Sequence, residues 1–497
     1  MLGRGRSATD WLALVSVGAI ASFVTVLCFV AARDPDARTL IAPVVVGLGA
    51  GGLILFRQLR KAASSLAASE QRAVFAATHD PLTGLPNRAL FAERVAEAVN
   101  NDAAGASAIF CIGLDRFDEL AELIGSAASD ALMVALAGRL TSLCGPRDTP
   151  SRIGDSTFAL LRRDGQGENP LSFAARLIET LTPPSPKDDA AFVSCSVGAS
   201  FVIPEAKVEL EGLREAQIAL SSSRDLGGRH AMLFQPEMDQ ALKHRKSLEA
   251  DLRQALADDD LFLLYQPQVN AKGAIVGVEA LVRWTSPTRG EVSPAIFVPL
   301  AERCGLIEAL GRFALRRALR DSVAWPGVTI AINVAAAQIK SGMLVRDLKT
   351  VTAECGRAAQ GVDLEITESV LLADDPATLE TLSTIRKLGF SITLDDFGTG
   401  YSSLSYLRRF PVDKIKIDQS FIRQLGRRPE SSAIVKAIVE LAEALELKVL
   451  AEGVETRDQV DRLGRLGCHL YQGFYFSEPL SAEALGQLVA RGTPLAA

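Results

Sequence analysis

Two long apolar runs lie near the amino-terminal end of the chain. Trp11–Ala32 contains 22 residues without a charge, and Leu40–Phe56 contains 17. As a helix with about 1.5 Å of rise per residue, the first run would span roughly 33 Å, which is enough to cross a bilayer. Arginines flank the pair on its outer sides, and the positive-inside rule then places both chain ends in the cytoplasm. The pattern predicts two transmembrane helices, at about 11–32 and 40–56. A cleaved signal peptide is the alternative for the first run.

The next segment, Arg57–Thr78, is rich in Ala, Ser and charged residues and contains neither Pro nor Gly, so it predicts a helical linker. From 79 to about 236, short apolar runs alternate with helix-length segments after a turn-rich opening at His79–Arg88. Alternating strands and helices are typical of an α/β sandwich. The expected strands are Ala108–Leu114, Phe158–Leu161 and Phe192–Phe201, and the expected helices are Ala89–Asn100 and Asp130–Leu143.

Residues 237–497 contain eight short apolar runs, and helix-length segments separate them from the second run onward. Eight such units in about 240 residues predict an α/β fold of the TIM-barrel type. Only Asn270–Ala274 joins the first two runs, which is too short for a crossover between parallel strands. The first strand should therefore be antiparallel, which makes this a modified TIM-type barrel. The eight runs are Leu261–Val269, Ile275–Trp284, Thr329–Val334, Leu364–Thr367, Ser391–Leu394, Lys414–Ile417, Lys448–Leu450 and Leu470–Phe474.

Composition narrows the chemistry. The chain has 53 Lys and Arg against 59 Asp and Glu, a net charge of −6, so binding of a polynucleotide in a basic groove is not expected. The seven Cys contain no CxxC pair, and the four His form no HExxH-like pair. Zinc held by Cys or His is therefore disfavoured. Metal chemistry in this chain has to rest on carboxylates, which points to Mg²⁺ or Mn²⁺.

Polar side chains stand where the apolar runs of the predicted barrel end. A barrel brings the carboxyl ends of its strands to one face, where the active sites of such barrels are built. Five or more acids that converge there would repel one another strongly, and divalent cations are the natural compensation. Adjacent Asp395 and Asp396 suit two metal ions about 3.5–4 Å apart. The strand-end residues are Glu279, Asn333, Glu365, Asp395, Asp396, Asp418, Glu452 and Gln472.

The segment 79–236 resembles the GGDEF (diguanylate cyclase) domain. The likeness rests on the opening H-D-P-L-T-G-L-P-N-R, on the strand that ends at Asp115, and on Ser196-Val197-Gly198-Ala199. The signature hairpin departs from the family, because R-x-G-G-D-E-F is replaced by R-I-G-D-S-T-F at Arg152–Phe158. Ser156 and Thr157 take the place of the acidic pair, and two neutral hydroxyls cannot replace two carboxylates as Mg²⁺ ligands.

Two further departures stand at functional positions of that family. Ala121 replaces the Asn that reads guanine, which counts against GTP binding, and Gly145 replaces the Arg of the product-inhibition motif, although Asp148 remains. The resemblance therefore implies a degenerate domain without cyclase activity, kept for regulation or dimerisation.

The segment 237–497 resembles the EAL-type cyclic di-GMP phosphodiesterase domain. The tripeptide Glu-Ala-Leu occurs four times, and only the one at Glu279 has the strand context of the family. No position that is catalytic in the family departs from its pattern. The motifs that carry the resemblance are Tyr265-Gln266-Pro267, Glu279-Ala280-Leu281-Val282-Arg283, Ile332-Asn333-Val334, Glu365-Ile366-Thr367-Glu368, Asp395-Asp396-Phe397-Gly398, Lys414-Ile415-Lys416-Ile417-Asp418, Ala451-Glu452-Gly453-Val454-Glu455 and Gln472-Gly473-Phe474.

The resemblance implies hydrolysis of cyclic di-GMP to linear pGpG with two Mg²⁺ or Mn²⁺ ions. It assigns the metal ions to Glu279, Asn333, Glu365, Asp395, Asp396 and Glu452, with Glu279, Lys416 and Glu452 as the catalytic residues. It assigns the substrate cleft to Gln266, Leu281, Arg283, Asp418 and Gln472, and support of the loop after Asp396 to Glu368 and Glu455. Whether Glu452 is the general base or a metal ligand stays open at this point.

Together with the two apolar runs, these assignments predict a homodimeric, membrane-embedded protein. It would be a multi-pass protein of the bacterial inner (cytoplasmic) membrane, with both catalytic-type domains in the cytoplasm. Two other functions remain as alternatives. One is a receptor that binds cyclic di-GMP without hydrolysing it, which should lack some metal ligands. The other is a bifunctional cyclase and phosphodiesterase, against which Ser156 and Thr157 count.

Overall fold

The computed structural model divides the chain into two compact units, Met1–Lys243 and His244–Ala497. We describe each unit by itself. The structure describes residues 35–101, 107–163, 168–182, 194–202, 210–258, 260–372, 375–398, 404–492 and 494–495, together with separate positions between 18 and 32.

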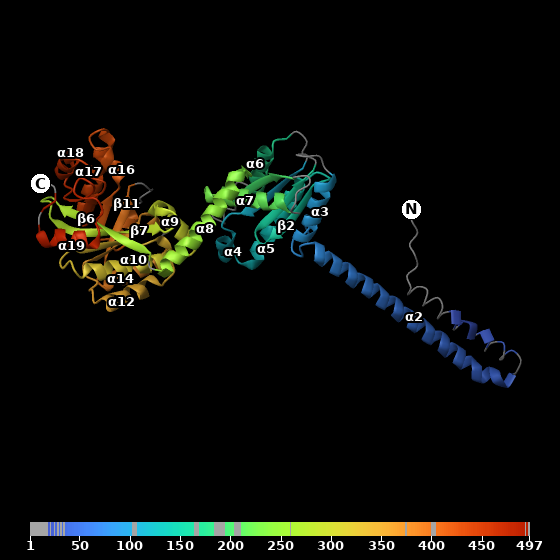
Figure 1. Ribbon diagram of the computed structural model, residues 1–497. Helices are drawn as coiled ribbons and strands as arrows, with labels where there is room; N and C mark the ends of the chain where they lie inside the picture. Colours follow the sequence, from blue (N-terminus) through green and yellow to red (C-terminus); the bar gives the residue numbers. More distant parts are fainter. Residues whose placement is uncertain are drawn as a thin grey trace. The chain divides into compact units, whose positions relative to one another are not determined.

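Helix α2 (Pro35–Thr78) is 44 residues long and contains both the predicted span Leu40–Phe56 and the segment Arg57–Thr78 (Figure 1). The predicted span 11–32 lies largely outside the described residues. Where the structure describes the chain, it holds no helix with both the length and the apolar character needed to cross a bilayer. The predictions of two transmembrane helices and of a multi-pass location in the inner membrane are therefore wrong. Leu40–Phe56 accounts for only about 25 Å of helix, against about 30 Å of hydrocarbon in a bilayer.

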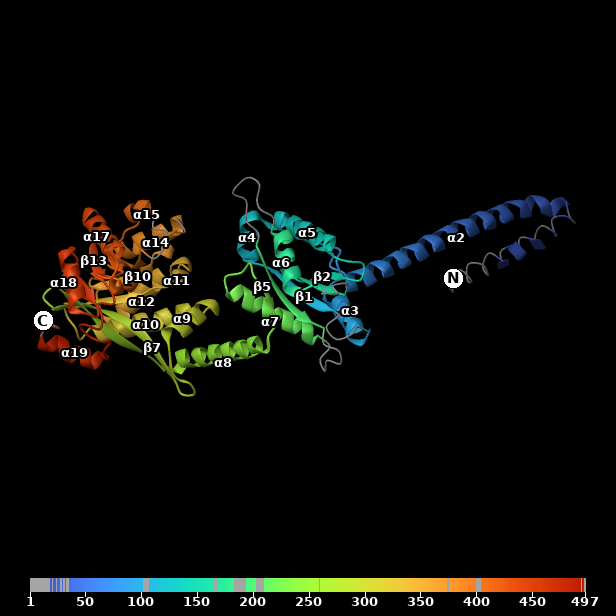
Figure 2. The same cartoon turned by 90° about the horizontal axis from the view of Figure 1, so that it is seen from above.

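The first unit is built on a five-stranded sheet with the order β2-β3-β1-β4-β5 (Figure 2). β1 pairs antiparallel with β3 and β4, while β4 and β5 are parallel. Neighbouring residues of β1 enter different cores, Phe110 one and Ile109 the other, because side chains alternate along a strand. The strands are β1 (Ala108–Leu114), β2 (Thr149–Gly154), β3 (Thr157–Arg162), β4 (Cys195–Phe201) and β5 (Ala231–Leu233). The helices are α3 (Arg88–Asn101), α4 (Phe117–Ile124), α5 (Ser126–Ser142), α6 (Pro170–Leu181) and α7 (Glu211–Asp225).

The second unit closes eight strands into a barrel. β6 pairs antiparallel with β7 on one side and with β14 on the other, and the remaining neighbours around the ring are parallel. The expectation of one antiparallel strand in an eight-stranded barrel is thus confirmed, and the short link between β6 and β7 is its cause. A ninth strand, β8 (Gly290–Val292), extends β7 as a hairpin. The barrel strands are β6 (Leu261–Asn270), β7 (Ile275–Ser286), β9 (Thr329–Asn333), β10 (Val362–Thr367), β11 (Ser391–Phe397), β12 (Lys414–Ile417), β13 (Lys448–Ala451) and β14 (Leu470–Gln472).

Helix α8 (Pro236–Asp258) precedes the barrel, and its residues Leu248 and Leu252 pack in a core with Trp284 of β7. The helices that follow the strands are α9 (Pro294–Arg303), α10 (Ile307–Ser322), α11 (Ala336–Lys340), α12 (Leu344–Cys355), α13 (Ser369–Leu372), α14 (Pro376–Lys387), α15 (Leu404–Arg409), α16 (Gln419–Arg423), α17 (Pro429–Ala444), α18 (Arg457–Arg465) and α19 (Ala482–Arg491).

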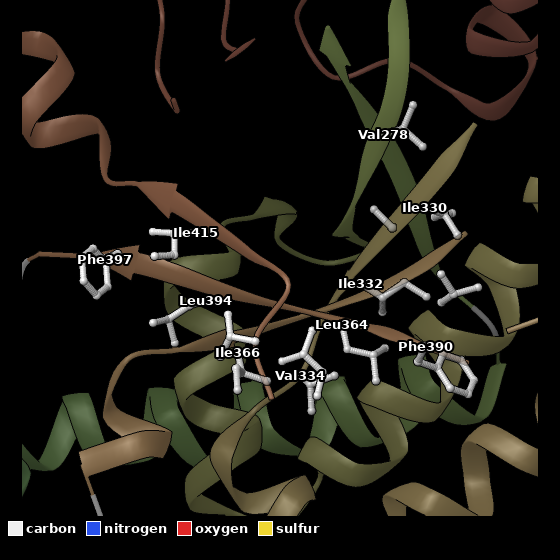
Figure 3. Packing of buried hydrophobic residues seen from close by; sticks show 14 of the residues in the cluster. Val278, Ile330, Ile332, Val334, Leu364, Ile366, Phe390, Leu394, Phe397 and Ile415 are labelled. Carbon is white, nitrogen blue, oxygen red and sulfur yellow. The ribbon is translucent and has the colours of Figure 1, made fainter. Parts of the chain in front are cut away.

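The main core of the second unit gathers hydrophobic side chains from β7, β9, β10, β11 and β12 (Figure 3). Leu364 and Ile366 of β10 belong to this core, and the residues that alternate with them, Asp363 and Glu365, are polar and buried. Because alternate residues of a strand point to opposite faces, the polar set faces the inside of the barrel. Glu365 and Lys416 are each 1% exposed. The fold therefore excludes water from charged groups that the sequence places at strand ends.

Candidate active site

A buried lysine lies among four carboxylates at the carboxyl ends of the barrel strands. The Nζ atom of Lys416 lies 2.6 Å from Glu452 Oε1 and 2.8 Å from Glu365 Oε2. The same atom lies 3.1 Å from Asp395 Oδ1 and 3.5 Å from Glu279 Oε2. Four of these five residues lie on four different strands, and Glu452 directly follows a fifth strand, β13. The strand ends therefore converge as the barrel topology requires, and acids that are up to 173 positions apart in the sequence meet in one cluster.

Side-chain amides fix the orientation of Glu279. Asn333 Nδ2 donates to Glu279 Oε1 at 2.8 Å, and Gln472 Nε2 donates to Glu279 Oε2 at 2.6 Å. Gln472 Nε2 also donates to Gln266 Oε1 at 3.1 Å, and Gln268 Nε2 donates to Gln472 Oε1 at 3.1 Å. Sequence reasoning missed Gln268. Its signal is the spacing of two from Gln266 on β6, which puts both amides on one face of the strand.

A local irregularity of β11 lets two consecutive aspartates serve one site. The register of β11 against β12 shifts between Leu394 and Phe397, which is typical of a β-bulge. Asp396 adopts a left-handed backbone with φ of 54°, which Asp tolerates better than most residues, and its N–H donates to Asp395 Oδ1 at 2.9 Å. In a regular strand the two carboxylates would point to opposite faces. The bulge is therefore the feature that brings both to the end of the barrel.

The oxygen atoms of the cluster form two groups that share one residue. One oxygen each of Glu279, Glu365 and Asp395 lie within 4.8 Å of one another, and the same holds for Asp395, Asp396 and Glu452. Glu365 Oε1 is buried and has no hydrogen-bond partner among the described residues. A buried carboxylate oxygen without a donor is costly unless a cation binds it. The oxygen-only donor set and this atom fit two hard divalent cations such as Mg²⁺ or Mn²⁺, and Asp395 is the residue that both groups share.

Charges in the cluster move the pKa values of Glu279 and Lys416 in opposite directions. Burial would raise the pKa of Glu279, but the charge of Lys416 and the hydrogen bonds from Gln472 and Asn333 outweigh it, so the pKa is lowered. Burial would lower the pKa of Lys416, but Glu279, Glu365, Glu452 and Asp395 raise it well above the ordinary value. Glu279 is thus held as a carboxylate, and Lys416 is held as a cation.

Three other acids of the cluster hold their protons more tightly than usual. Burial raises the pKa of Glu452 to about 8, and the charges of Asp395 and Glu279 act in the same direction. Burial and the charge of Glu279 raise the pKa of Glu365 well above its usual range. Burial also raises the pKa of Asp396, together with the charge of Asp395. A single lysine therefore does not compensate all the acids, which is the electrostatic condition for cation binding.

A cleft of about 230 Å³ opens beside the acid cluster. Of the predicted site residues, Gln266, Glu279, Glu452, Glu455 and Gln472 line it. Sequence reasoning missed three further lining residues, which are Gln419, Arg423 and Phe474. Gln419 and Arg423 come one turn apart on α16, directly after a strand-end aspartate, and this spacing is the signal that could have found them.

The remaining predicted substrate residues lie elsewhere. Leu281 and Arg283 are half-buried on β7 and are not among the residues that line the cleft, and Arg283 Nη1 donates to the carbonyl of Val282 at 2.9 Å. Asp418 begins α16 and accepts a hydrogen bond from Ser420 N at 2.9 Å as a helix cap. Glu368 accepts from Gly398 N at 3.2 Å, at the start of the loop that follows the aspartate pair. Residues 399–403 of that loop lie outside the described residues.

A second cleft, of about 310 Å³, lies in the first unit beside the β2–β3 hairpin and is lined by Asp115, Ser156 and Arg224, among others. The carboxylate of Asp115 accepts hydrogen bonds from Ser194 Oγ at 3.0 Å and Ser196 Oγ at 2.8 Å. It also accepts from Arg229 N at 3.2 Å and lies 3.7 Å from Arg224 Nε. Protein donors therefore occupy this carboxylate on both oxygens, in contrast to Glu365.

Comparison with known proteins identifies both units. The family described as "EAL domain" matches residues 249–479, and the family described as "Diguanylate cyclase, GGDEF domain" matches residues 77–230. The bifunctional diguanylate cyclase/cyclic di-GMP phosphodiesterase MucR of Pseudomonas aeruginosa is 35% identical over 437 residues, which cover 86% of this chain and 64% of MucR. An uncharacterised protein of Mycobacterium bovis is 34% identical over 437 residues, covering 85% of this chain and 69% of that protein.

A solved structure shares the fold over both units. The S helix-GGDEF-EAL part of Vibrio cholerae LapD, bound to c-di-GMP, is 19% identical and has a TM-score of 0.50, with 83% of this chain and 99% of that chain covered. The chain spans only part of its curated relatives, between 51% and 64% of the length of three of them. On these matches the chain belongs to the family of proteins that join a GGDEF domain to an EAL domain.

Proposed function

We propose that the barrel hydrolyses cyclic di-GMP to linear pGpG with the help of two divalent cations. The observation that carries the proposal is the pair of oxygen groups that share Asp395, together with the buried Glu365 Oε1 that has no donor among the described residues. Relatives support the choice of substrate, since MucR, with 35% identity, is described as a cyclic di-GMP phosphodiesterase as well as a cyclase.

The residues that would hold the two cations form two sets with one shared member. Glu279, Asn333, Glu365 and Asp395 would hold one cation, and Asp395, Asp396 and Glu452 would hold the other. When bound, the cations supply Lewis-acid polarisation of the phosphodiester and acidify the attacking water. Asn333 and Gln472 keep Glu279 in place by their hydrogen bonds to its two oxygens. The donor set contains only oxygen atoms, which favours Mg²⁺ or Mn²⁺.

Lys416 and Glu452 are the proposed catalytic groups beside the cations. Lys416 carries a buried, fixed positive charge, which offsets the negative charge that gathers on the phosphate as the bond to the leaving oxygen breaks. Glu452 Oε1 lies 2.6 Å from Lys416 Nζ, and burial raises the pKa of Glu452 to about 8. A pKa near the working pH suits a general base that removes a proton from the attacking water. Glu452 is also one of the three residues that would hold the second cation.

The cleft supplies groups for the rest of the substrate. Gln266 and Gln472 offer amides beside the acid cluster, and Arg423 and Phe474 line the cleft with a cation and an exposed ring. We keep Leu281, Arg283 and Asp418 as proposed substrate contacts on the family resemblance alone.

Three further expectations from the sequence remain proposals. Glu368 and Glu455 would support the loop after Asp396. The limits 79–236 and 237–497 would bound the two domains, and the chain would act as a homodimer.

We propose that the GGDEF-like domain does not make cyclic di-GMP. Ser156 and Thr157 offer no carboxylate at the hairpin, and the carboxylate of Asp115 is engaged by Ser194, Ser196 and Arg229. A metal ion at this place would have to displace donors that Asp115 already has. The domain would then regulate the barrel or contribute to dimerisation.

Turnover of cyclic di-GMP by the purified full chain tests the proposal. With Mn²⁺ or Mg²⁺ we expect linear pGpG as the product, and Asp395→Asn should abolish it. Binding of cyclic di-GMP without turnover by the wild-type chain would show a receptor instead. Synthesis of cyclic di-GMP from GTP by the wild-type chain would show a bifunctional enzyme.

A further inference from the structure

A second polar layer lies inside the barrel, one step from the acid cluster towards the amino ends of the strands. It consists of Asp363 on β10, Thr393 on β11 and Lys414 on β12. Each of them stands two residues before a member of the cluster on the same strand, namely Glu365, Asp395 and Lys416. Because residues two apart on a strand share a face, the two layers stack. Each layer combines an acid from β10 with a lysine from β12.

The three side chains of the second layer form hydrogen bonds with one another. Lys414 Nζ donates to Asp363 Oδ2, and Thr393 Oγ1 donates to Asp363 Oδ1 at 2.7 Å. Both oxygens of Asp363 therefore have a donor within the layer. The side chains of Asp363 and Lys414 are 1% and 11% exposed, so water offers little compensation if either charge loses its partner. Asp363 binds Lys414 just as Glu365 binds Lys416 in the layer above.

Strand pairing and apolar packing hold these three strands together beside this ion pair. β10, β11 and β12 are held by parallel backbone ladders, and Leu364, Ile392 and Ile415 between them are at most 2% exposed. Two apolar side chains of similar volume would stabilise such a place as well as a buried ion pair, or better. The ion pair instead fixes the positions of the two charges, since Asp363 and Lys414 hold each other.

The ion pair between Asp363 and Lys414 also affects which acids Lys416 approaches. A lysine side chain is long and flexible, and its charge moves to the acids that are least compensated. Asp363 stands two residues before Glu365 on β10, about 7 Å along the strand, so its charge acts on the upper layer. Without Lys414, Asp363 would be a buried, uncompensated carboxylate. Lys416, two residues after Lys414, is the other lysine of β12.

We propose that Asp363 and Lys414 are positioning residues, whose ion pair keeps Lys416 directed at the acid cluster of the active site. The catalytic part of this inference rests on the proposed phosphodiesterase function. The electrostatic part does not, because it also predicts how the cluster binds a cation.

Three variants of the full chain test the inference, with kcat and KM for cyclic di-GMP, Mn²⁺ affinity and the melting temperature as readouts. Lys414→Met should lower kcat at least about tenfold with KM within about twofold, because Lys416 is drawn away from the phosphate. It should tighten Mn²⁺ binding by about threefold or more, since the cluster loses positive charge. Asp363→Asn should also lower kcat, but it should weaken Mn²⁺ binding, since Lys414 is then free to approach the same acids.

The double variant Asp363→Asn/Lys414→Met should recover kcat and Mn²⁺ affinity to within about threefold of the wild type, because both charges are gone. A purely structural role would weaken Mn²⁺ binding in both single variants alike. The control Arg289→Met removes an ion pair between the β7–β8 turn and Asp251 of α8, and it should leave kcat and Mn²⁺ affinity unchanged.

A folded Lys414→Met variant with wild-type kcat and Mn²⁺ affinity would overturn the inference. So would a double variant that is no better than the single ones. If the wild-type chain does not turn over cyclic di-GMP but the two single variants shift Mn²⁺ affinity in opposite directions, the proposed function fails and the electrostatic role of the second layer stands.

Discussion

The two clefts of this chain hold carboxylates in opposite conditions. In the barrel, Glu365 is buried beside one lysine and has an oxygen without a donor among the described residues. In the first unit, Asp115 receives two serine hydroxyls and a backbone N–H and lies beside an arginine. The number of acids near a cleft is therefore less informative than the donors that each acid already has. Asp115 has donors from the protein on both oxygens, whereas Glu365 keeps one oxygen available for a cation.

The largest expected effect comes from removing a charge at the centre of the barrel site. Glu279→Gln keeps the volume of the side chain but removes a carboxylate that two amides orient, and we expect turnover of cyclic di-GMP to fall at least about 10³-fold. Glu443→Gln is the matched control, because exposed Glu443 begins another Glu-Ala-Leu tripeptide, at the end of α17. Assay of pGpG formation checks both variants. Near-normal turnover in Glu279→Gln would place the chemistry elsewhere.

Loss of the buried lysine should be nearly as severe and should depend on metal. Lys416→Met leaves acids of the cluster without their internal cation, so we expect the metal-free protein to lose about 3 kcal/mol of unfolding free energy. Saturating Mn²⁺ should return much of that stability, while kcat stays about 10²-fold below the wild type. Urea unfolding with and without Mn²⁺ measures the first effect. If Mn²⁺ stabilised the wild type and the variant equally, Lys416 and the cations would not share the same acids.

Metal binding by the barrel should depend on pH with a definite sign. The pKa values of Glu365, Asp396 and Glu452 are raised, and that of Glu452 lies at about 8, so Glu452 holds a proton in most metal-free molecules at neutral pH. A cation must displace these protons, and its affinity therefore rises with pH until the acids are ionised. We expect Mn²⁺ affinity to increase about tenfold from pH 6 to pH 8. Calorimetry in buffers of different ionisation enthalpy would detect the released protons, and their absence would contradict the electrostatic description.

The smallest effect is expected from a substitution in the first unit, and it tests the difference between Asp115 and Glu365. Asp115→Asn removes an acceptor of charge-assisted contacts, and we expect the unit to lose about 1 kcal/mol of stability. Turnover of cyclic di-GMP should not change. We expect no Mg²⁺ binding at Asp115 in the wild type, so the variant should not differ from it in Mg²⁺ binding to the first unit. If the wild-type unit bound Mg²⁺ and the variant did not, Asp115 would be a metal ligand after all, and the distinction between the clefts would fail.

The sequence allowed the barrel and most of its polar centre to be predicted, for a physical reason. The link Asn270–Ala274 permits only an antiparallel pair, and strand ends of a barrel must meet, so residues such as Glu279 and Glu452 were expected together. Asp363 and Lys414 were missed because they lie towards the amino ends of β10 and β12, whereas candidate residues were sought at the carboxyl ends of the strands. Gln268 was missed as well.

Other expectations depended on more than strand order. Asp418, which stays a proposed substrate contact, also caps α16, and the strand order alone did not predict this cap. Leu40–Phe56 was interpreted by its apolar character alone, but it continues without a break into the charged part of one long helix. The prediction of a helix over Arg57–Thr78 agrees with α2, whereas the prediction that the apolar run crosses a bilayer does not hold.

Electron paramagnetic resonance of Mn²⁺ bound to the full chain counts the bound ions and reports whether they are neighbours. We expect two Mn²⁺ ions per barrel with a spin-coupled signal in the wild type, and loss of the coupled signal in Asp395→Asn, because Asp395 is the residue that both oxygen groups share. A wild-type barrel that binds a single isolated Mn²⁺, or a coupled pair that survives Asp395→Asn, would contradict this expectation.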